Sequence, residues 1–313
     1  MSSDAHAIAL PEPRRRGRFA VGRKATLRIM LAPTVVWILG LAIFPLLYSL
    51  YLSFTSKRLG AGGSEQLVGF DNFSNAFSDP RFIAALKFTA MFTVASVTIE
   101  MVLGFALALL LDTVTRARGT VRTIWTIPLF ATPVAMAYLA LTMFNEAGGI
   151  INSGLESIGI GGVQWLSDPS IAPLTIILLD VWQWTPFVVL ILFAALQSIP
   201  ADISEAARVD GASTRQFIRT LVLPLLKPAL LTVLFLRIAD SLKMFDFAFA
   251  LTGGGPGTST EPASLYAYRE GLESFRLGYA SALAYILFAA SILVGLGILA
   301  WIRRSTSQGA TGR

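Results

Sequence analysis

The chain has 313 residues, of which 54% are hydrophobic and only 14% are charged, and its mean hydropathy is +0.66. A soluble domain carries about 25% charged residues, so this composition excludes an ordinary soluble protein and indicates a chain built for a lipid bilayer. The apolar residues come in long blocks separated by short polar loops. This pattern predicts one continuous membrane domain with no sizeable soluble domain between the blocks.

Six apolar blocks are each near the length of about 20 residues that a helix needs to cross the hydrocarbon core. In chain order they are Ile29–Phe54, Ala84–Leu111, Ile124–Phe144, Ile171–Leu196, Ala229–Leu251 and Ala282–Ile302. We therefore predict an all-α, polytopic membrane protein with six transmembrane helices. Prolines inside the blocks, such as Pro128 and Pro133, predict kinks rather than ends, because packed membrane helices tolerate proline. The first block is too long for a secretory signal, whose apolar region spans about 7 to 15 residues.

The lysines and arginines are distributed unequally between the two sides. With the N-terminus inside the cell, 17 of the 25 face the cytoplasm and six face outward, while Arg237 and Lys243 lie in the fifth block. The positive-inside rule therefore predicts a multi-pass protein of the inner (cytoplasmic) membrane with both termini cytoplasmic. The predicted parts are a basic tail over 1–28, a membrane domain over 29–302 and a C-terminal tail over 303–313. Because the basic residues border the membrane, they indicate contact with anionic lipid and not with nucleic acid.

The loop after the fourth block has the pattern of two short helices that meet at a glycine. Asp202 and Glu205 have the spacing of a capping box, and Gly211 can adopt the left-handed conformation that ends a helix. Ser213 or Thr214 can cap a second helix, which is expected to stop before the next proline. In a soluble protein this pattern would suggest a helix-turn-helix DNA reader. The simpler alternative is a solvated amphipathic loop without a partner.

This segment, residues 204–224, resembles the EAA loop of binding-protein-dependent ABC importers. The pattern of that loop is Glu-Ala-Ala, three residues, Gly, nine residues, Ile, one residue and Leu-Pro. The positions that match in register are Glu205, Ala206, Ala207, Gly211, Leu223 and Pro224. Leu221 stands where the pattern has Ile, a change that keeps the apolar volume. The stretches WQWTPFVVLILFAALQSIP, FNEAGGIIN and FDFAFALTGGGPGTST also look like the carbohydrate-importer branch of the family, and the resemblance extends from Ile29 to Ile302.

The resemblance implies a permease subunit whose EAA segment, residues 204–224, docks into a groove of a cytoplasmic ATPase. The residues expected to couple the two subunits are Glu205, Ala206, Ala207, Asp210, Gly211, Leu223 and Pro224. It also implies a second, homologous permease subunit, two cytoplasmic ABC ATPase subunits and an extracytoplasmic solute-binding protein. The expected solute is a small carbohydrate: a sugar, a polyol or a related glycerol derivative.

The sequence lacks the motifs of an enzyme that would power or catalyse a reaction itself. No G-x-x-x-x-G-K-[ST] motif occurs, so ATP and Mg²⁺ are expected on the partner ATPase subunits and no cofactor on this chain. The Gly-rich stretch Leu251–Thr260 is predicted to be an external turn and not a phosphate-binding loop. With one histidine, His6, and no cysteine, metal and thiol chemistry are not expected. An intramembrane enzyme and a channel or secondary transporter are the competing classes, and neither needs an ATPase-docking loop.

The fifth block carries four charges at three-residue intervals, namely Arg237, Asp240, Lys243 and Asp246. A lone charge at the middle of the bilayer costs about 2.5 to 3.5 kcal/mol on insertion scales, so these side chains should face protein or water. Opposite charges at this spacing can pair along one helix. The set is therefore either a polar wall of a solute pathway or a neutralised structural zipper against a neighbouring helix.

Other polar and aromatic residues inside the blocks are weaker candidates. Glu100 and Asp180 are further acids expected to be buried. Trp182 and Trp184 can stack on the apolar face of a sugar or belong to the interfacial aromatic belt, and both interpretations stay open. Small residues such as Gly104 predict close helix packing.

Overall fold

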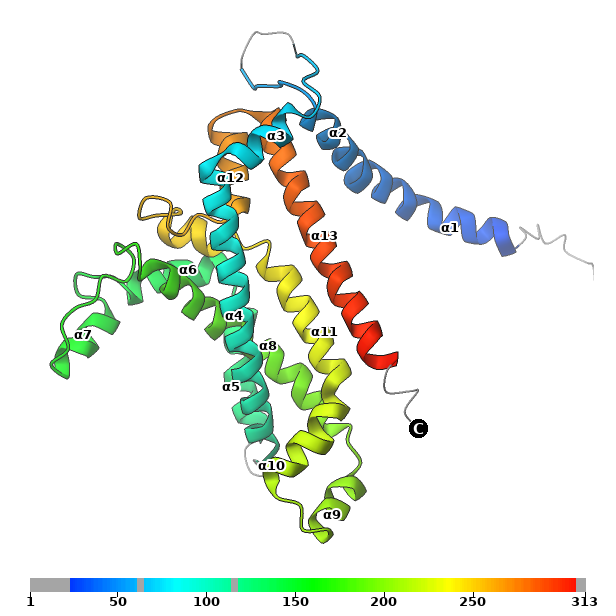
Figure 1. Cartoon of the computed structure of the whole chain (residues 1–313), viewed down its shortest axis with the longest axis vertical. Coiled ribbons are helices and arrows are strands. Elements are labelled where there is room, and N and C mark those ends of the chain that lie inside the picture. The colour runs from blue at the N-terminus through cyan, green and yellow to red at the C-terminus, as the bar shows by residue number, and fades with distance from the viewer. Residues whose placement is uncertain (1–22, 61–64, 114–117, 308–313) are drawn as a thin grey trace, which may run out of the picture. The chain divides into compact units, whose positions relative to one another are not determined.

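The computed structural model describes most of the chain (Figure 1). The described residues are 23–60, 65–113 and 118–307. Residues 1–22 of the predicted N-terminal tail, including His6, and residues 308–313 of the predicted C-terminal tail lie outside the described residues. The chain divides into two compact units, Met1–Ser49 and Leu50–Arg313.

Helices make up the regular structure of the described residues, apart from a single antiparallel bridge between Thr55 and Leu67. The α-helices are α1 (Arg23–Ile38), α2 (Phe44–Ser53), α3 (Asp71–Ser78), α4 (Pro80–Thr113), α5 (Arg118–Phe130), α6 (Pro133–Met143), α7 (Ile150–Ser157), α8 (Ala172–Gln197), α9 (Ala201–Val209), α10 (Thr214–Phe217), α11 (Leu223–Ser241), α12 (Ala263–Tyr268) and α13 (Leu277–Ser307). Four π-helical turns join some of them, namely η1 (Leu39–Ile43), η2 (Ile218–Val222), η3 (Ala248–Thr252) and η4 (Arg269–Glu273). The predicted all-α class is confirmed.

Five helices of the described chain are long and apolar enough to cross a membrane. Their bounds are Thr26–Ser53, Pro80–Thr113, Ala172–Gln197, Thr214–Ser241 and Leu277–Ala300. A bent pair, α5 and α6, makes a sixth crossing if the two are counted as one span. The helices Pro80–Thr113 and Leu277–Ala300 start four and five residues before their apolar blocks. A block marks only the part of a helix that matches the hydrocarbon and not the turns beyond it.

The second unit is organised around α4 and α8, which pack along each other, with α11 against both. Gly104 of α4 is buried, and a Cβ atom built on it would lie 2.5 Å from Val188 Cγ1 of α8. Only a glycine therefore permits this separation of the two helix backbones, and the predicted close packing at Gly104 is confirmed. Phe92, Ile176 and Leu192 are among the buried side chains between these helices.

Within the predicted span Ile124–Phe144, the expectation that Pro133 kinks a helix without ending it is wrong, because α5 ends and α6 begins there with a bend of 97°, as in a broken span or a re-entrant loop. The chain breaks directly before Pro133, whose ring disfavours a helical conformation for the preceding residue. That residue, Thr132, caps α6 by accepting a hydrogen bond from the Ala135 amide on its side-chain oxygen. The Ala131 carbonyl freed at the break accepts from Gln183 Nε2 of α8 at 2.9 Å. Pro128, by contrast, lies inside α5 without ending it.

The fifth block also differs from its prediction, since the helix begins at Thr214 and ends at Ser241 instead of running over Ala229–Leu251. It passes through Pro224, where the second helix of the EAA segment was expected to stop. The wider π-helical turn η2 lies directly before this proline, and its last hydrogen bond runs from the Leu223 amide to the Ile218 carbonyl. A π-turn at this point accommodates the missing proline donor and its ring without breaking the helix.

Candidate functional site

The EAA segment consists of α9, a left-handed turn and the start of the helix that continues into α11. Gly211 has φ of +70° and its amide bonds the Arg208 carbonyl at 3.1 Å, which ends α9 as predicted. Ser213 caps the next helix in a capping box with Gln216, also as predicted. The capping box expected between Asp202 and Glu205 is wrong, because α9 begins one residue before Asp202 with Pro200 at its N-cap.

Most of the residues expected to couple this segment to a partner are exposed. Glu205, Ala206, Asp210, Gly211, Leu223 and Pro224 are exposed, whereas Ala207 is buried. Val209 of α9, which the sequence pattern did not single out, has 87% of its surface exposed. A single exposed apolar side chain is common on protein surfaces, so Val209 alone does not mark an interface.

The four charges of the fifth block do not form a ladder along one helix. Arg237 and Asp240 lie on α11, and Arg237 Nη1 donates to Asp240 Oδ2 at 2.7 Å. Because α11 ends at Ser241, Lys243 and Asp246 belong to the turn and the helical stretch that follow it. Neither of these two has an ion-pair partner within the part of the chain that the structure describes. The expected pairing along one helix is therefore confirmed only for Arg237 with Asp240.

Arg237 instead forms an ion network with acids from two other helices. Its Nε donates to Glu100 Oε2 of α4 at 2.6 Å, and its Nη2 donates to Glu100 Oε1 at 2.8 Å. The same Nη2 donates to Asp180 Oδ2 of α8 at 2.9 Å. The guanidinium carbon lies 4.7 Å from the centre of the Trp184 ring. We call these five residues, Glu100, Asp180, Trp184, Arg237 and Asp240, the Arg237 network.

Burial separates the members of this network. Glu100 and Arg237 are 0% and 1% exposed, and Asp180 is buried as well, whereas the Asp240 side chain is 55% exposed. Paired and hydrogen-bonded charges are the form in which charged groups persist in a protein interior. The network joins α4, α8 and α11 at the level where α11 ends. The predictions that Glu100 and Asp180 are buried acids are confirmed.

A small pocket of about 100 Å³ lies beside the exposed end of the network. Its polar lining residues are Asp180, Trp184, Asp240, Ser241, Lys243 and Asp246. Arg237 does not line it, because its guanidinium is enclosed by the carboxylates. We call this cavity the charged pocket; it brings together three of the four predicted charges of the fifth block and one of the two tryptophans.

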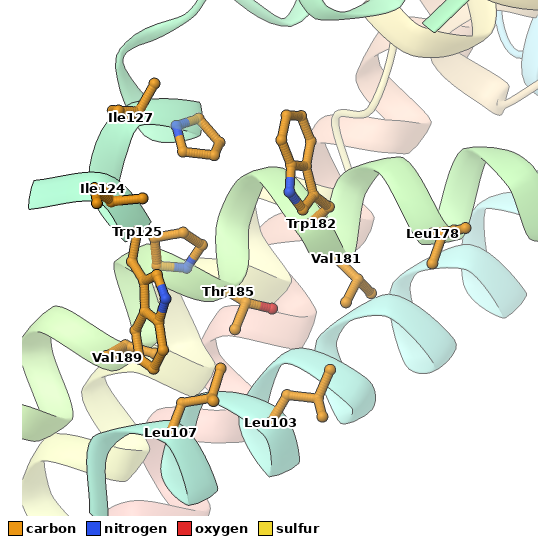
Figure 2. Close-up of a pocket in the computed structure, with 12 residues that line it drawn as sticks. Leu103, Leu107, Ile124, Trp125, Ile127, Leu178, Val181, Trp182, Thr185 and Val189 are labelled. Atoms are coloured by element: carbon orange, nitrogen blue, oxygen red, sulfur yellow. The ribbon is translucent and has the colours of Figure 1, made fainter. Parts of the chain in front are cut away.

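Trp182 lies elsewhere, in an apolar groove of about 580 Å³ between α4, α5 and α8 (Figure 2). Leu103, Trp125 and Val181 are among its other lining side chains. Two residues along a helix correspond to a rotation of about 200°, so Trp182 and Trp184 face opposite sides of α8. The two tryptophans, which the sequence offered for stacking on a sugar or for the interfacial belt, therefore line different cavities.

A further buried acid, Glu261, was missed by the sequence analysis. It is 0% exposed and follows the Gly-rich stretch Leu251–Thr260. Arg81 Nε and Nη2 donate to its two carboxylate oxygens at 2.7 and 2.8 Å, and Arg269 also donates to it. Arg269 in turn donates to the Gly253 carbonyl, so Glu261 fixes one end of the glycine-rich turn. Sequence offers only a weak signal for this role, since an acid beside a glycine-rich turn is usually solvated.

The segment between α6 and α8 is held together by side chains of the FNEAGGIIN stretch. The Glu146 carboxylate accepts from the Ser167 hydroxyl and from the Leu166 and Ser167 amides. The Ser167 hydroxyl and these amides lower the pKa of Glu146. Asn152 bonds the Val163 backbone and accepts from Trp165 Nε1 at 2.8 Å. The stretch therefore has a structural role in this chain.

No group of three or more histidine or acidic side chains is placed to hold a metal ion within the residues that the structure describes. In the Arg237 network the guanidinium occupies the position between the carboxylates that a cation would take. The site therefore offers ion pairs, hydrogen bonds and an aromatic ring, which are groups that bind and orient a polar solute.

A bundle of apolar helices with an exposed two-helix segment and a charged pocket defines a membrane transport protein, and comparisons with known proteins agree. Residues 100–308 match the family described as "Binding-protein-dependent transport system inner membrane component". The chain belongs to this family. It is the permease subunit of a carbohydrate ABC importer, a transport component and not the ATPase.

Curated relatives and a solved structure match over most of their length. The chain is 34% identical over 276 residues to the sulfoquinovosyl glycerol transport system permease protein SmoG of Agrobacterium fabrum, covering 88% of this chain and 89% of that one. It is 35% identical over 272 residues to the trehalose/maltose transport system permease protein MalF of Thermococcus litoralis, covering 86% and 92%. A chain of a bacterial alginate ABC transporter, solved with an alginate-pentasaccharide-bound periplasmic protein, has a TM-score of 0.82 at 28% identity, covering 91% of this chain and 96% of that one.

Proposed function

We propose that the chain forms, with a second homologous permease subunit, the pathway by which a carbohydrate crosses the cytoplasmic membrane. An extracytoplasmic solute-binding protein delivers the solute, and two cytoplasmic ABC ATPase subunits bind ATP and Mg²⁺ and drive the transport. Both termini and the EAA segment lie in the cytoplasm. The solved alginate transporter with its periplasmic protein supports an importer that works with a binding protein.

The observation that carries this proposal is the helix that starts in the EAA segment and ends at the charged pocket. Its 28 residues from Thr214 to Ser241 form one apolar helix. The exposed surface of Glu205, Ala206 and Val209 precedes its first turn, and Lys243 and Asp246 of the pocket follow its last. A movement of the EAA segment caused by an ATPase is therefore transmitted along one continuous element to the pocket.

The chemistry of the charged pocket suits a hydroxyl-rich solute. Lys243 donates hydrogen bonds, Asp240 and Asp246 accept them, and Trp184 offers an aromatic face for the apolar side of a sugar ring. We assign these four residues to the solute pathway. Trp182 faces the apolar groove and Arg237 is enclosed, so neither is assigned to contact the solute.

The proposed solute is a sugar, a polyol or a related glycerol derivative. The relatives named above carry trehalose and maltose or sulfoquinovosyl glycerol by their names, and these solutes share several hydroxyl groups. The first test is reconstitution of the complete importer with its binding protein, followed by uptake of labelled trehalose, maltose and sulfoquinovosyl glycerol. ATP-dependent uptake of at least one hydroxyl-rich solute is expected. The proposal would be overturned if the purified importer complex contained this chain but no ATPase subunit.

The proposed orientation has its own test. Reporter domains fused at Ser305 should be active in the cytoplasm, and a reporter inserted at Ser157 should be active outside. A cytoplasmic signal from Ser157, which follows α6 and lies at the end of α7, would contradict the assignment of the EAA segment to the cytoplasm.

A further inference from the structure

The Arg237 network contains a residue that is close to the charged pocket but does not line it. Glu100 is 0% exposed and its two oxygens hold Nε and Nη2 of Arg237 in a two-bonded arrangement. Such a fork fixes the plane of the guanidinium as well as its distance. The orientation of Arg237 is therefore set from α4, by a residue that does not line the pocket.

The fixed guanidinium determines what faces the pocket. Arginine has five N–H donors, and four hydrogen bonds use them here: two to Glu100, one to Asp180 and one to Asp240. The bond from Nη1 holds one oxygen of the half-exposed Asp240 carboxylate. The guanidinium also lies over the ring of Trp184. Two groups at the edge of the pocket are thus positioned by one side chain that a solute cannot reach.

The charges of the Arg237 network also determine the electrostatic potential in the pocket. The network holds one cation, Arg237, against three carboxylates, and Lys243 and Asp246 add one charge of each sign nearby. Unit charges a few ångströms apart in a protein interact strongly, because the protein screens them less than water does. Removing the charge of Glu100 therefore makes the pocket less acidic, even though Glu100 is not exposed to it.

We infer that Glu100 is a positioning residue of the solute pathway: through Arg237 it holds Asp240 and Trp184 at the charged pocket and sets the charge that a solute meets there. The inference rests on the proposed function of that pocket. It assigns a determinant of solute selection to a buried helix that the solute does not touch.

The test uses the absence of cysteine from the chain. In the complete importer, Phe245→Cys introduces one thiol into this subunit at a half-buried position that lines the pocket. The probes are two methanethiosulfonate reagents of similar size, one cationic (aminoethyl) and one anionic (sulfonatoethyl). The measured quantity is the ratio of their labelling rates, cationic over anionic. A change in access alone alters both rates together and leaves this ratio constant.

Two variants in this background should move the ratio in opposite directions. Glu100→Gln removes one negative charge behind the pocket and should lower the ratio at least about threefold. Arg237→Lys keeps the charge but lacks the planar fork, so the buried carboxylates retain the cation and Asp240 is released. This variant should raise the ratio about twofold or more. The matched control is Glu261→Gln, which removes another buried acid paired with arginines and should leave the ratio unchanged.

The outcomes separate this inference from the proposed function. An unchanged ratio in both variants overturns the positioning role of Glu100 and leaves the pathway assignment intact. No reaction with either reagent in the Phe245→Cys parent means that the pocket is closed to small solutes, which overturns the pathway assignment and the inference with it. If Glu100→Gln does not assemble, Arg237→Lys decides alone, and no rise overturns the inference. If neither assembles while Glu261→Gln does, the network serves only folding, and the inference is wrong.

Discussion

The two ends of the helix Thr214–Ser241 differ in how their charged groups are satisfied. At the EAA segment, Glu205 and Asp210 are exposed, and neither has an ion-pair partner in the described chain. At the other end, Arg237 is enclosed by carboxylates from three helices. Charges without internal partners sit on a surface available to another subunit, whereas charges with internal partners fix the geometry of a site. In the proposed function, the same helix thus links the surface that docks to the ATPase with the charged pocket.

The largest effect is expected at the recognition end. Gly211 has φ of +70°, and a proline there would fix φ near −65°, so Gly211→Pro should redirect α9 and abolish uptake at an unchanged level of the subunit in the membrane. Glu205→Lys should do the same by reversing the exposed charge. The measurement is uptake together with ATP hydrolysis stimulated by the binding protein.

Gly211→Ala is the graded control, because a non-glycine residue in this conformation costs about 1 kcal/mol and leaves the turn in place. It should retain most of the uptake. Normal uptake in both Gly211→Pro and Glu205→Lys would contradict the docking role of the EAA segment.

The next largest effect is on assembly and concerns the buried end. Arg237→Gln leaves Glu100 and Asp180 without their cation, and breaking a buried ion pair in this way costs about 3 to 5 kcal/mol. We expect a marked loss of assembled importer and of its thermal stability. Asp240→Asn is the comparison, since its side chain is 55% exposed and an exposed pair contributes about 1 kcal/mol or less. Equal stability of the two variants would mean that burial does not distinguish the members of the network.

A smaller effect on transport should separate the two interpretations of the charges near the pocket. The double variant Asp240→Asn with Lys243→Gln should assemble like the parent and import solute several-fold more slowly, because the lost hydrogen bonds were made to the solute. The measurement is uptake per assembled complex. Full recovery of uptake in the double variant, with a defect in each single one, would favour a structural pair and remove both residues from the pathway.

The smallest effect concerns a region that is neither docking surface nor pocket. The pKa of Glu146 is lowered in the folded chain by the Ser167 hydroxyl and by the Leu166 and Ser167 amides. A lowered folded-state pKa stabilises the fold above the unfolded-state value and loses that contribution as pH falls through the folded-state value. Protection of these amides from hydrogen exchange should therefore decrease below about pH 4 in the parent. Glu146→Gln should show no such dependence, and a parent without it would contradict the assigned contacts.

Composition predicted the helices well because crossing a bilayer demands about 20 apolar residues whatever their neighbours are. Gly211 and Ser213 were also predictable, since a left-handed turn and a capping box depend on residues within four positions. The sequence did not predict which proline breaks a helix. Pro133 does so and Pro224 does not, and the difference depends on a tertiary hydrogen bond from Gln183 and on a π-turn.

The sequence also did not predict the ion-pair partners of the buried charges. Spacing along the fifth block favoured pairing between neighbours on one helix, and this holds for Arg237 with Asp240. Glu100 is 137 positions away from Arg237, and only the packing of α4 against α11 brings them together. Local patterns do not encode such a contact, and for the same reason Glu261 was missed.

The length of the helix from Thr214 to Ser241 has a mechanical consequence. At about 1.5 Å per residue, its 28 residues form a rod of about 42 Å. A rotation of about 10° around its midpoint moves its two ends by nearly 4 Å in opposite directions. This is about the distance between the contacting atoms of two packed side chains. The rod acts as a lever whose fulcrum lies among the helices that it crosses. In the proposed function, a small swing of this rod at its EAA end would therefore open or close a passage for a sugar at its other end.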